Sequence, residues 1–479
     1  MKEIKIEARQ KTKIVATVGP ACNSPENLLK LVKEGVDVFR LNFSHGSHAD
    51  HLKVINNLTD IIEKYNVPIG ILADLQGPKI RVGEIEGGKL ELIKGDVLTF
   101  VNEPCIGTRE KIYLSYKSFA DDVKIGEKVL VDDGKLVLEV IDKDGRTVKL
   151  KVLYGTNIAS NKGVNLPDTK VSLPCLTEKD LIDLEFVLTQ PVNWIALSFV
   201  RKAEDIIELK EIIEKNNHYA KVIAKIEKPE AVANIKDIVN HTDAIMVARG
   251  DLGVEVPMEK LPGIQKDIIK RCLNKAKPVI VATQMMESMI TNPSPSRAEI
   301  TDVANAVLDG ADAVMLSGET SVGNHPDLVV KAMNKIIAEA EKNYELLEKR
   351  PKPNKKSETY YSDTICINAA RIAENVKAKA ILGITISGYT AFKVSSYRPK
   401  SNIYIFSSLR PILGTLNLVW GVKAFYYDKF SSTDETIEDT IEILKEKKLL
   451  KEKDIVVNTA SMPLHKRFRT NTLKITHVE

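Results

Sequence analysis

Two neighbouring stretches, Lys221-Val-Ile-Ala-Lys-Ile-Glu227 and Asp243-Ala-Ile-Met-Val-Ala-Arg-Gly-Asp251, decide the fold of this chain. Each is a short apolar run that stops abruptly at charged residues, and one helix-length interval separates them. Strands that are buried on both faces of a parallel sheet have this pattern, so the charged residues mark the points where the strands emerge. Glu227 and Asp251 are therefore predicted on neighbouring strands, where two carboxylates can approach one cation.

The same alternation of an apolar strand with an amphipathic helix recurs from Lys13 onward. Short Gly, Asn or Pro signals precede several runs, and the intervals mostly suit one helix and two loops. The eight predicted strands are Lys13 to Val18, Val36 to Phe43, Pro68 to Asp74, Val192 to Phe199, Lys221 to Ile226, Asp243 to Val247, Pro278 to Ala282 and Asp312 to Leu316. Eight such units predict an α/β protein with a closed (β/α)8 barrel, the TIM barrel, and chemistry at the carboxyl ends of its strands.

Two segments depart from this alternation. Residues 77–171 contain short alternating runs punctuated by Gly and Asp, which predicts an inserted β domain, a small β-barrel. It is attached at the carboxyl end of a strand, where it can cover the site as a lid. A polar, proline-marked linker begins at Pro351, and the strand runs beyond it predict a separate α/β unit. We expect domains at 1–76 with 172–350, at 77–171 and at 351–479.

Composition limits the class of protein. An apolar fraction of 43% and a charged fraction of 28% are those of a globular protein, and 69 basic against 65 acidic residues leave no nucleic-acid footprint. The five cysteines are isolated and lack metal-ligand spacing, which indicates a reducing compartment. No apolar run reaches the length of a membrane span or forms a signal-peptide core. We expect a cytoplasmic protein that binds neither nucleic acid nor membrane.

Lys225 lies inside a predicted barrel strand, so it cannot remain a solvated surface charge. Burial of an unpaired ammonium group costs several kcal/mol or lowers its pKa. Glu227 would then be either a purely structural ion-pair partner of this lysine or a metal ligand. Because Asp251 follows the next strand, Glu227 and Asp251 together are better explained as hard oxygen ligands for Mg²⁺.

Polar residues also end the second and third predicted strands. Arg40, Asn42 and Ser44 alternate with apolar residues and point one way, which favours recognition of a phosphate or carboxylate, with a structural ion pair as the alternative. Asp74 lies at the barrel mouth, and Lys79 and Arg81 enter the insert. The basic side chains of Lys79 and Arg81 either bind nucleotide phosphates or are surface charges at a domain junction.

Further strand ends carry groups that are individually weaker signals. Gly250 belongs to an Arg-Gly-Asp turn whose backbone N–H groups suit a carboxylate or phosphate. Hydroxyls at Thr283 and Ser317 are candidates for proton relay, and Lys162 ends the insert where it can reach back over the cleft. In the C-terminal unit, a loop at a helix N-terminus resembles a phosphate nest, with plain helix capping as the alternative, and its residues are Thr385, Ser387, Gly388 and Thr390.

Taken together, these motifs resemble the pyruvate kinase family over nearly the whole chain. The matching blocks occur in the right order, which makes the resemblance specific. They are residues 12–20 (TKIVATVGP), 40–46 (RLNFSHG), 161–167 (NKGVNLP), 224–227 (AKIE), 248–253 (ARGDLG), 282–285 (ATQM) and 316–320 (LSGET). The resemblance implies a barrel, an inserted lid, a C-terminal regulatory domain and a homotetramer.

The resemblance also implies a reaction, in which phosphoenolpyruvate and ADP give pyruvate and ATP. It assigns Mg²⁺, with Mn²⁺ as an alternative, to Glu227 and Asp251. Arg40 and Lys225 would bind the phosphoryl group, and Gly250, Asp251 and Thr283 the substrate carboxylate. The nucleotide would face Asn42, His45, Arg81 and Lys162, and protonation of the enolate would use water relayed through Thr283, Ser317 and Glu319.

Two departures from the family pattern lead to further expectations. Many members bind K⁺ through residues matching Asn42, Ser44 and Asp74 and carry Glu where this chain has Lys79, so we expect activity without added K⁺. Members activated by fructose 1,6-bisphosphate often have a Gly-rich effector loop, where this chain has residues 461–469 (SMPLHKRFR). We expect a sugar phosphate or nucleotide monophosphate as effector.

Two other readings compete with this one. A Mg²⁺-dependent enolate aldolase or lyase also uses paired carboxylates in a barrel, but it needs neither the lid nor Lys162 and Lys225. A catalytically dead metabolite sensor would show losses among the site residues, and Lys225, Glu227, Asp251 and Thr283 are all present.

Overall fold

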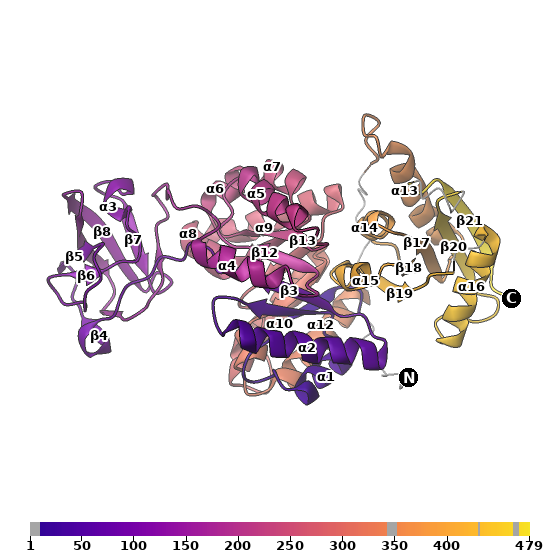
Figure 1. The fold of residues 1–479 in the computed structure, drawn as a ribbon, viewed down its shortest axis with the longest axis horizontal. Helices are drawn as coiled ribbons and strands as arrows, with labels where there is room; N and C mark the ends of the chain where they lie inside the picture. The colour runs from indigo at the N-terminus through magenta and orange to yellow at the C-terminus, as the bar shows by residue number, and fades with distance from the viewer. Residues whose placement is uncertain (1–9, 343–351, 430–431, 463–468) are drawn as a thin grey trace.

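The computed structural model describes residues 10–342, 352–429, 432–462 and 469–479 (Figure 1). Eight parallel strands close into a barrel in the order β1-β16-β15-β14-β13-β12-β3-β2. They are β1 (Lys13–Thr17), β2 (Val38–Asn42), β3 (Gly70–Asp74), β12 (Trp194–Leu197), β13 (Lys221–Ile226), β14 (Ala244–Ala248), β15 (Val279–Ala282) and β16 (Ala313–Leu316). The (β/α)8 barrel is confirmed, and each strand lies where the sequence pattern predicted it.

Amphipathic helices surround the barrel, and side-chain caps begin several of them. Ser24, Ser47, Thr177 and Ser296 each accept a hydrogen bond from a backbone N–H of the first turn, which satisfies a donor that has no partner within the helix. The helices are α1 (Pro25–Glu34), α2 (His48–Tyr65), α4 (Glu178–Val187), α5 (Ala203–Lys215), α6 (Pro229–Ala233), α7 (Ile235–His241), α8 (Arg249–Glu255), α9 (Leu261–Lys275), α10 (Arg297–Asp309), α11 (Gly318–Ser321) and α12 (Pro326–Lys342). None of the helices in the described ranges is long and apolar enough to cross a membrane.

The insert between β3 and β12 is built from β-strands, as predicted. Its strands are β4 (Lys89–Glu91), β5 (Val97–Val101), β6 (Ile112–Tyr113), β7 (Lys128–Val131), β8 (Leu136–Lys143), β9 (Thr147–Tyr154), β10 (Asn157–Ala159) and β11 (Val164–Asn165), with one helical turn, α3 (Phe119–Asp122). They pair as a six-stranded sheet, β11-β7-β8-β9-β5-β6, and a two-stranded sheet, β10-β4. The segment around Arg81 and Val82 joins the two outer strands of the six-stranded sheet, because Arg81 bridges to Gly163 beside β11 and Val82 bridges to Leu114 beside β6. The insert therefore closes on itself as the small β-barrel that we predicted.

The C-terminal unit is a five-stranded sheet with the order β19-β18-β17-β20-β21, in which only β21 is antiparallel. Its strands are β17 (Ala380–Ile384), β18 (Asn402–Ser407), β19 (Val422–Tyr426), β20 (Ile455–Ala460) and β21 (Thr472–His477). Its helices are α13 (Tyr360–Asn375), α14 (Tyr389–Ser396), α15 (Arg410–Leu416) and α16 (Thr433–Glu446). The separate α/β unit is therefore confirmed.

The two added units lie at opposite ends of the barrel (Figure 1). The C-terminal unit packs against the amino ends of the strands, where the Trp194 indole N–H donates to the Thr415 carbonyl at 3.2 Å. Leu418 of this unit joins the apolar cluster inside the barrel. At 3.0 Å the buried Arg398 pairs with Asp312, which precedes β16. The insert leaves the barrel at the carboxyl end of β3, which keeps the regions expected for catalysis and regulation apart.

Candidate active site

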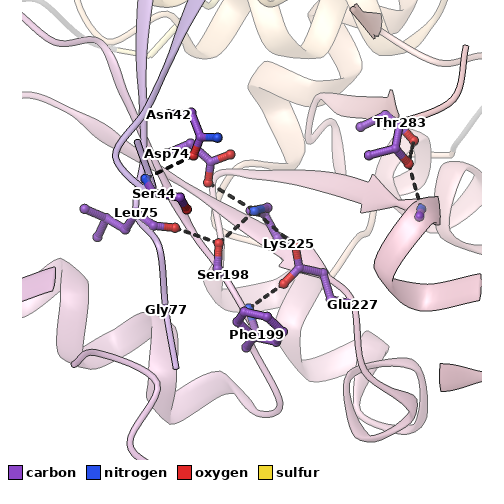
Figure 2. A network of polar contacts seen from close by, with 12 residues as sticks. Asn42, Ser44, Asp74, Leu75, Gly77, Ser198, Phe199, Lys225, Glu227 and Thr283 are labelled. Atoms are coloured by element: carbon purple, nitrogen blue, oxygen red, sulfur yellow. Dashed lines mark hydrogen bonds and ion pairs between the residues drawn. The ribbon is translucent and has the colours of Figure 1, made fainter. Parts of the chain in front are cut away.

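Lys225, on β13, is the centre of a buried polar network at the carboxyl ends of the strands (Figure 2). Its ammonium group donates to Ser198 Oγ at 2.7 Å and contacts Glu227 Oε1 at 3.0 Å and Asp74 Oδ1 at 3.2 Å. Only 12% of the Lys225 side chain is exposed. Burial alone would lower the pKa of this lysine, but the Asp74 and Glu227 carboxylates outweigh burial and raise it, so Lys225 is a fixed positive charge.

Arg40 reaches the same network from β2. Its Nε donates to Asp74 Oδ2 at 2.6 Å, and its terminal nitrogen donates to Thr17 Oγ at 3.0 Å. Asp74 therefore accepts from two cations that belong to different strands. Burial favours the neutral form of Asp74, but Lys225 and Arg40 outweigh it and lower the pKa of this carboxyl.

Glu227 and Asp251 follow the neighbouring strands β13 and β14, as predicted. Glu227 Oε2 accepts the Phe199 N–H at 2.8 Å. Burial and the nearby Asp251 carboxylate raise the pKa of Glu227 against the opposing effect of Lys225. A cation placed between Glu227 and Asp251 would offset the repulsion between these two carboxylates.

The donor set fits Mg²⁺ held jointly by protein and substrate. Among the described residues, no group of three or more His, Cys, Asp and Glu side chains could hold a metal ion alone. Mg²⁺ commonly uses only one or two carboxylates and completes its octahedron with waters and substrate phosphate oxygens. Glu227 and Asp251 supply such a pair.

Thr283 directly follows β15 and lies beside Gly250. Its hydroxyl accepts the Gly250 N–H at 2.7 Å. Thr283 and Gln284 have φ angles of 68° and 55°, a left-handed conformation that is strained for a β-branched residue such as threonine. Arg249 holds this turn, because its guanidinium donates to the Thr283 carbonyl at 2.9 Å and pairs with Asp302 at 2.7 Å. Arg249 is thus a structural support.

Ser317 and Glu319 follow β16 and form a second polar group at the barrel mouth. Glu319 accepts the N–H groups of Ser317 at 2.6 Å and Met286 at 3.1 Å, and burial raises its pKa. Ser317 Oγ is buried and has no hydrogen-bond partner among the described residues. An unpaired buried hydroxyl of this kind is suited to bind a water molecule.

The candidate nucleotide-binding residues lie on two parts of the protein, the barrel and the insert. Asn42 and His45 lie where β2 leads into α2, and Asn42 Oδ1 accepts the Ser44 N–H at 3.2 Å. Arg81 and Lys162 lie on the insert, where Arg81 donates to the Asn161 carbonyl and Lys162 pairs with Asp132 at 3.0 Å. No hydrogen bond or ion pair joins the two groups within the described residues, so their approach depends on the position of the insert.

Lys79 and the candidate effector loop lie away from the lysine network. Lys79 is exposed and lines a narrow cleft between the insert and the barrel that also contains Asp251. The effector loop begins α14 in the C-terminal unit. There Thr385 Oγ accepts the Gly388 N–H at 2.9 Å, and the Thr390 and Thr470 hydroxyls lie 2.5 Å apart. Residues 463–468, most of the segment that replaces a Gly-rich effector loop, lie outside the described residues.

Ser198 and Phe199 are functional positions that we did not predict. Both follow β12, and Ser198 also donates to the Leu75 carbonyl at 2.7 Å, which fixes the hydroxyl that receives Lys225. Phe199 has a φ of 56°, and this conformation turns its N–H toward Glu227. The available signal was their position: they end a predicted barrel strand, as the other site residues do.

The closed (β/α)8 barrel brings together a lysine, an arginine and two carboxylates at the carboxyl ends of its strands. This arrangement defines a class of protein, the barrel enzymes that act on anionic substrates. Residues 9–330 match the family model for the pyruvate kinase barrel domain, and residues 363–476 match the model for the pyruvate kinase alpha/beta domain. The chain belongs to the pyruvate kinase family.

Individual relatives agree with the family models. A pyruvate kinase of Geobacillus stearothermophilus is 43% identical over 470 residues, which cover 98% of this chain and 80% of that protein. A pyruvate kinase of Corynebacterium glutamicum is 42% identical, with 97% of both chains covered. The crystal structure of a pyruvate kinase from Cryptosporidium parvum superposes with a TM-score of 0.91 at 36% identity and covers 98% of this chain and 96% of its own.

The buried position of Asp74 predicts how stability depends on pH. Because its pKa is lowered in the folded protein, its stabilising contribution is full above its ordinary pKa of 3.8 and is lost as the pH falls through the lowered value. We expect Asp74→Asn to cost about 3 to 5 kcal/mol at pH 7, since it leaves Arg40 and Lys225 without their shared anion.

Unfolding midpoints of the wild type and Asp74→Asn should be measured between pH 7 and pH 3. The difference between the two proteins should shrink below about pH 4. Asp142→Asn, which removes an exposed pair with Lys149, is the control and should change the midpoint little. A difference that stays constant over this pH range would contradict the assignment.

Proposed function

We propose that this chain is a pyruvate kinase that transfers the phosphoryl group of phosphoenolpyruvate to ADP and gives pyruvate and ATP. The observation that carries the proposal is the buried Lys225 beside the repelling pair Glu227 and Asp251, beneath the root of the insert. An aldolase or lyase has no need of this lysine or of the insert. A catalytically dead metabolite sensor has no need of all the site residues, Lys225, Glu227, Asp251 and Thr283.

In this proposal Lys225 and Arg40 bind the phosphoryl group. Lys225 neutralises charge on the transferring group and on the enolate oxygen that it leaves. Because both cations are already fixed by Asp74, they need no reorganisation when charge develops, which is the main source of catalysis in phosphoryl transfer.

Glu227 and Asp251 hold Mg²⁺, with Mn²⁺ as an alternative ion. When bound, the ion would neutralise negative charge on the substrate and polarise its oxygens. Gly250, Asp251 and Thr283 bind the carboxylate, the first two through their backbone N–H groups. The Gly250 N–H that now bonds to Thr283 is the donor that the substrate would take over.

The remaining residues serve the nucleotide and the final proton. Asn42 and His45 from the barrel, with Arg81 and Lys162 from the insert, bind ADP. The enolate is then protonated at carbon by water that is relayed through Thr283, Ser317 and Glu319. The unpaired Ser317 hydroxyl and the raised pKa of Glu319 support this role.

A monovalent cation is dispensable in our proposal. Asn42, Ser44 and Asp74 match the K⁺ ligands of relatives, but this chain has a lysine, Lys79, where many relatives have Glu, and its positive charge would take the place of the ion. Its ammonium group forms no ion pair within the described part of the chain, so it is available to move toward the nucleotide and Asp74.

The wider organisation follows from the family resemblance. We propose domains at 1–76 with 172–350, 77–171 and 351–479, a homotetramer in the cytoplasm, and an effector that carries a phosphate. The effector would bind at the start of α14, where Thr385, Ser387, Gly388 and Thr390 surround the helix N-terminus. Five free cysteines support a reducing compartment.

Lys225→Met tests the reaction. We expect it to abolish pyruvate formation in a coupled assay with ADP and Mg²⁺, because in this proposal Lys225 neutralises the charge on the transferring group and on the enolate oxygen, while the circular dichroism spectrum stays unchanged. Lys149→Met, an exposed lysine of the insert, is the control and should be fully active. Normal turnover of Lys225→Met would refute its role, and an inactive wild type would favour the aldolase or sensor.

The dispensability of K⁺ is tested by turnover in tetramethylammonium and in K⁺ buffers of equal ionic strength. We expect comparable rates, because Lys79 replaces the charge. Lys79→Glu should lose activity in tetramethylammonium and recover it in K⁺. A large drop of the wild-type rate without K⁺ would sink this proposal.

The effector proposal is tested by titration with sugar phosphates and nucleotide monophosphates. At least one should shift the phosphoenolpyruvate saturation curve to lower concentration, and Ser387→Ala should weaken that shift without changing the curve measured in its absence. If none of these compounds moves the wild-type curve, the effector site fails.

A further inference from the structure

Glu255 is a buried carboxylate on α8 that the proposed mechanism does not use. It follows Asp251 by four residues, so both side chains lie on the same face of this helix. The Glu255 side chain is fully buried. Its Oε1 accepts hydrogen bonds from two partners on different parts of the molecule, while Oε2 is buried without a described partner.

The first partner, Asn165, belongs to the insert. Its Nδ2 donates to Glu255 Oε1 at 2.8 Å. Asn165 is the second residue of β11 and pairs with Leu130 of β7, so its backbone is part of the six-stranded sheet. A hydrogen bond to this side chain therefore links the sheet to α8.

The second partner, Lys228, belongs to the barrel. Its ammonium bonds to Glu255 and lies 6.0 Å from the centre of the Phe199 ring, and only 13% of the side chain is exposed. The Phe199 N–H in turn donates to Glu227. Glu255 is thus joined to Asp251 through α8 and to Glu227 through Lys228 and Phe199.

We propose that Glu255 is a positioning residue that docks the insert on α8 and couples the position of the insert to the two metal-binding carboxylates. The proposal rests on the function proposed above and deepens it. Because Arg81 and Lys162 lie on the insert, whereas Arg40 and Lys225 lie on the barrel, docking acts on ADP and leaves phosphoenolpyruvate binding to the barrel.

Separate variants remove each of the two side chains that bond to Glu255. Asn165→Leu removes only the hydrogen bond to the insert and leaves the Lys228–Glu255 pair intact. Lys228→Met removes the connection from Glu255 to Phe199 and Glu227. Lys149→Met removes an insert lysine whose ion-pair partner among the described residues, Asp142, also lies on the insert, and it serves as the matched control.

Two measurements test the coupling in the full-length protein. Steady-state kinetics at saturating Mg²⁺ give KM for ADP and for phosphoenolpyruvate separately. Hydrogen exchange of the backbone around β11 and α8, without substrates, reports docking independently of activity. For Asn165→Leu we expect KM for ADP to rise about tenfold, as for a lost hydrogen bond to a charged group, while KM for phosphoenolpyruvate stays within about twofold.

Exchange at β11 and α8 should be faster in Asn165→Leu and unchanged in Lys149→Met. Lys228→Met should in addition raise the Mg²⁺ concentration needed for half-maximal activity, because it disturbs Glu227. Equal changes in both KM values, no change in either, or unchanged exchange at β11 would overturn the proposal. If the wild type does not turn over phosphoenolpyruvate and ADP, the proposed function fails, and the exchange data still decide whether Glu255 docks the insert.

Discussion

The architecture of the site depends on one buried anion, Asp74. It lies on β3 between Arg40 of β2 and the side chain of Lys225, and it accepts from both. Two cations this close repel each other, and their burial would otherwise cost several kcal/mol each. By pairing with both, Asp74 allows two positive charges to remain at the barrel mouth, where water is largely excluded.

This pairing also sets the electrostatic starting point for an anionic substrate. Lys225 is balanced by Asp74 and Glu227, so the network is close to neutral before a ligand arrives. An incoming phosphate adds negative charge beside fixed cations, whereas a divalent ion beside Glu227 and Asp251 relieves their repulsion. Substrate and metal therefore favour each other's binding, as is usual where a metal ion keeps few protein ligands.

The barrel fold could be predicted from the sequence because its apolar strands alternate regularly with amphipathic helices. Apolar runs followed by polar residues located all eight strands, and the charged residues at the ends of two of them located Lys225, Glu227 and Asp251. Ser198, Phe199 and Glu255 escaped because their roles come from contacts between elements far apart in the chain. The left-handed conformation of Phe199 and Thr283 is likewise imposed by packing, and neither residue type favours it.

The short strand β12 touches both ends of the molecule. Its first residue, Trp194, bonds to Thr415 of the C-terminal unit, and Ser198, directly after the strand, bonds to Lys225. Only about 13 Å of extended backbone separates these two contacts. A chimaeric enzyme that exchanged the C-terminal unit for that of a relative would thus change the packing at the start of the strand that leads to the Ser198–Lys225 hydrogen bond. The surface that contacts Trp194 therefore has to be kept together with the catalytic barrel.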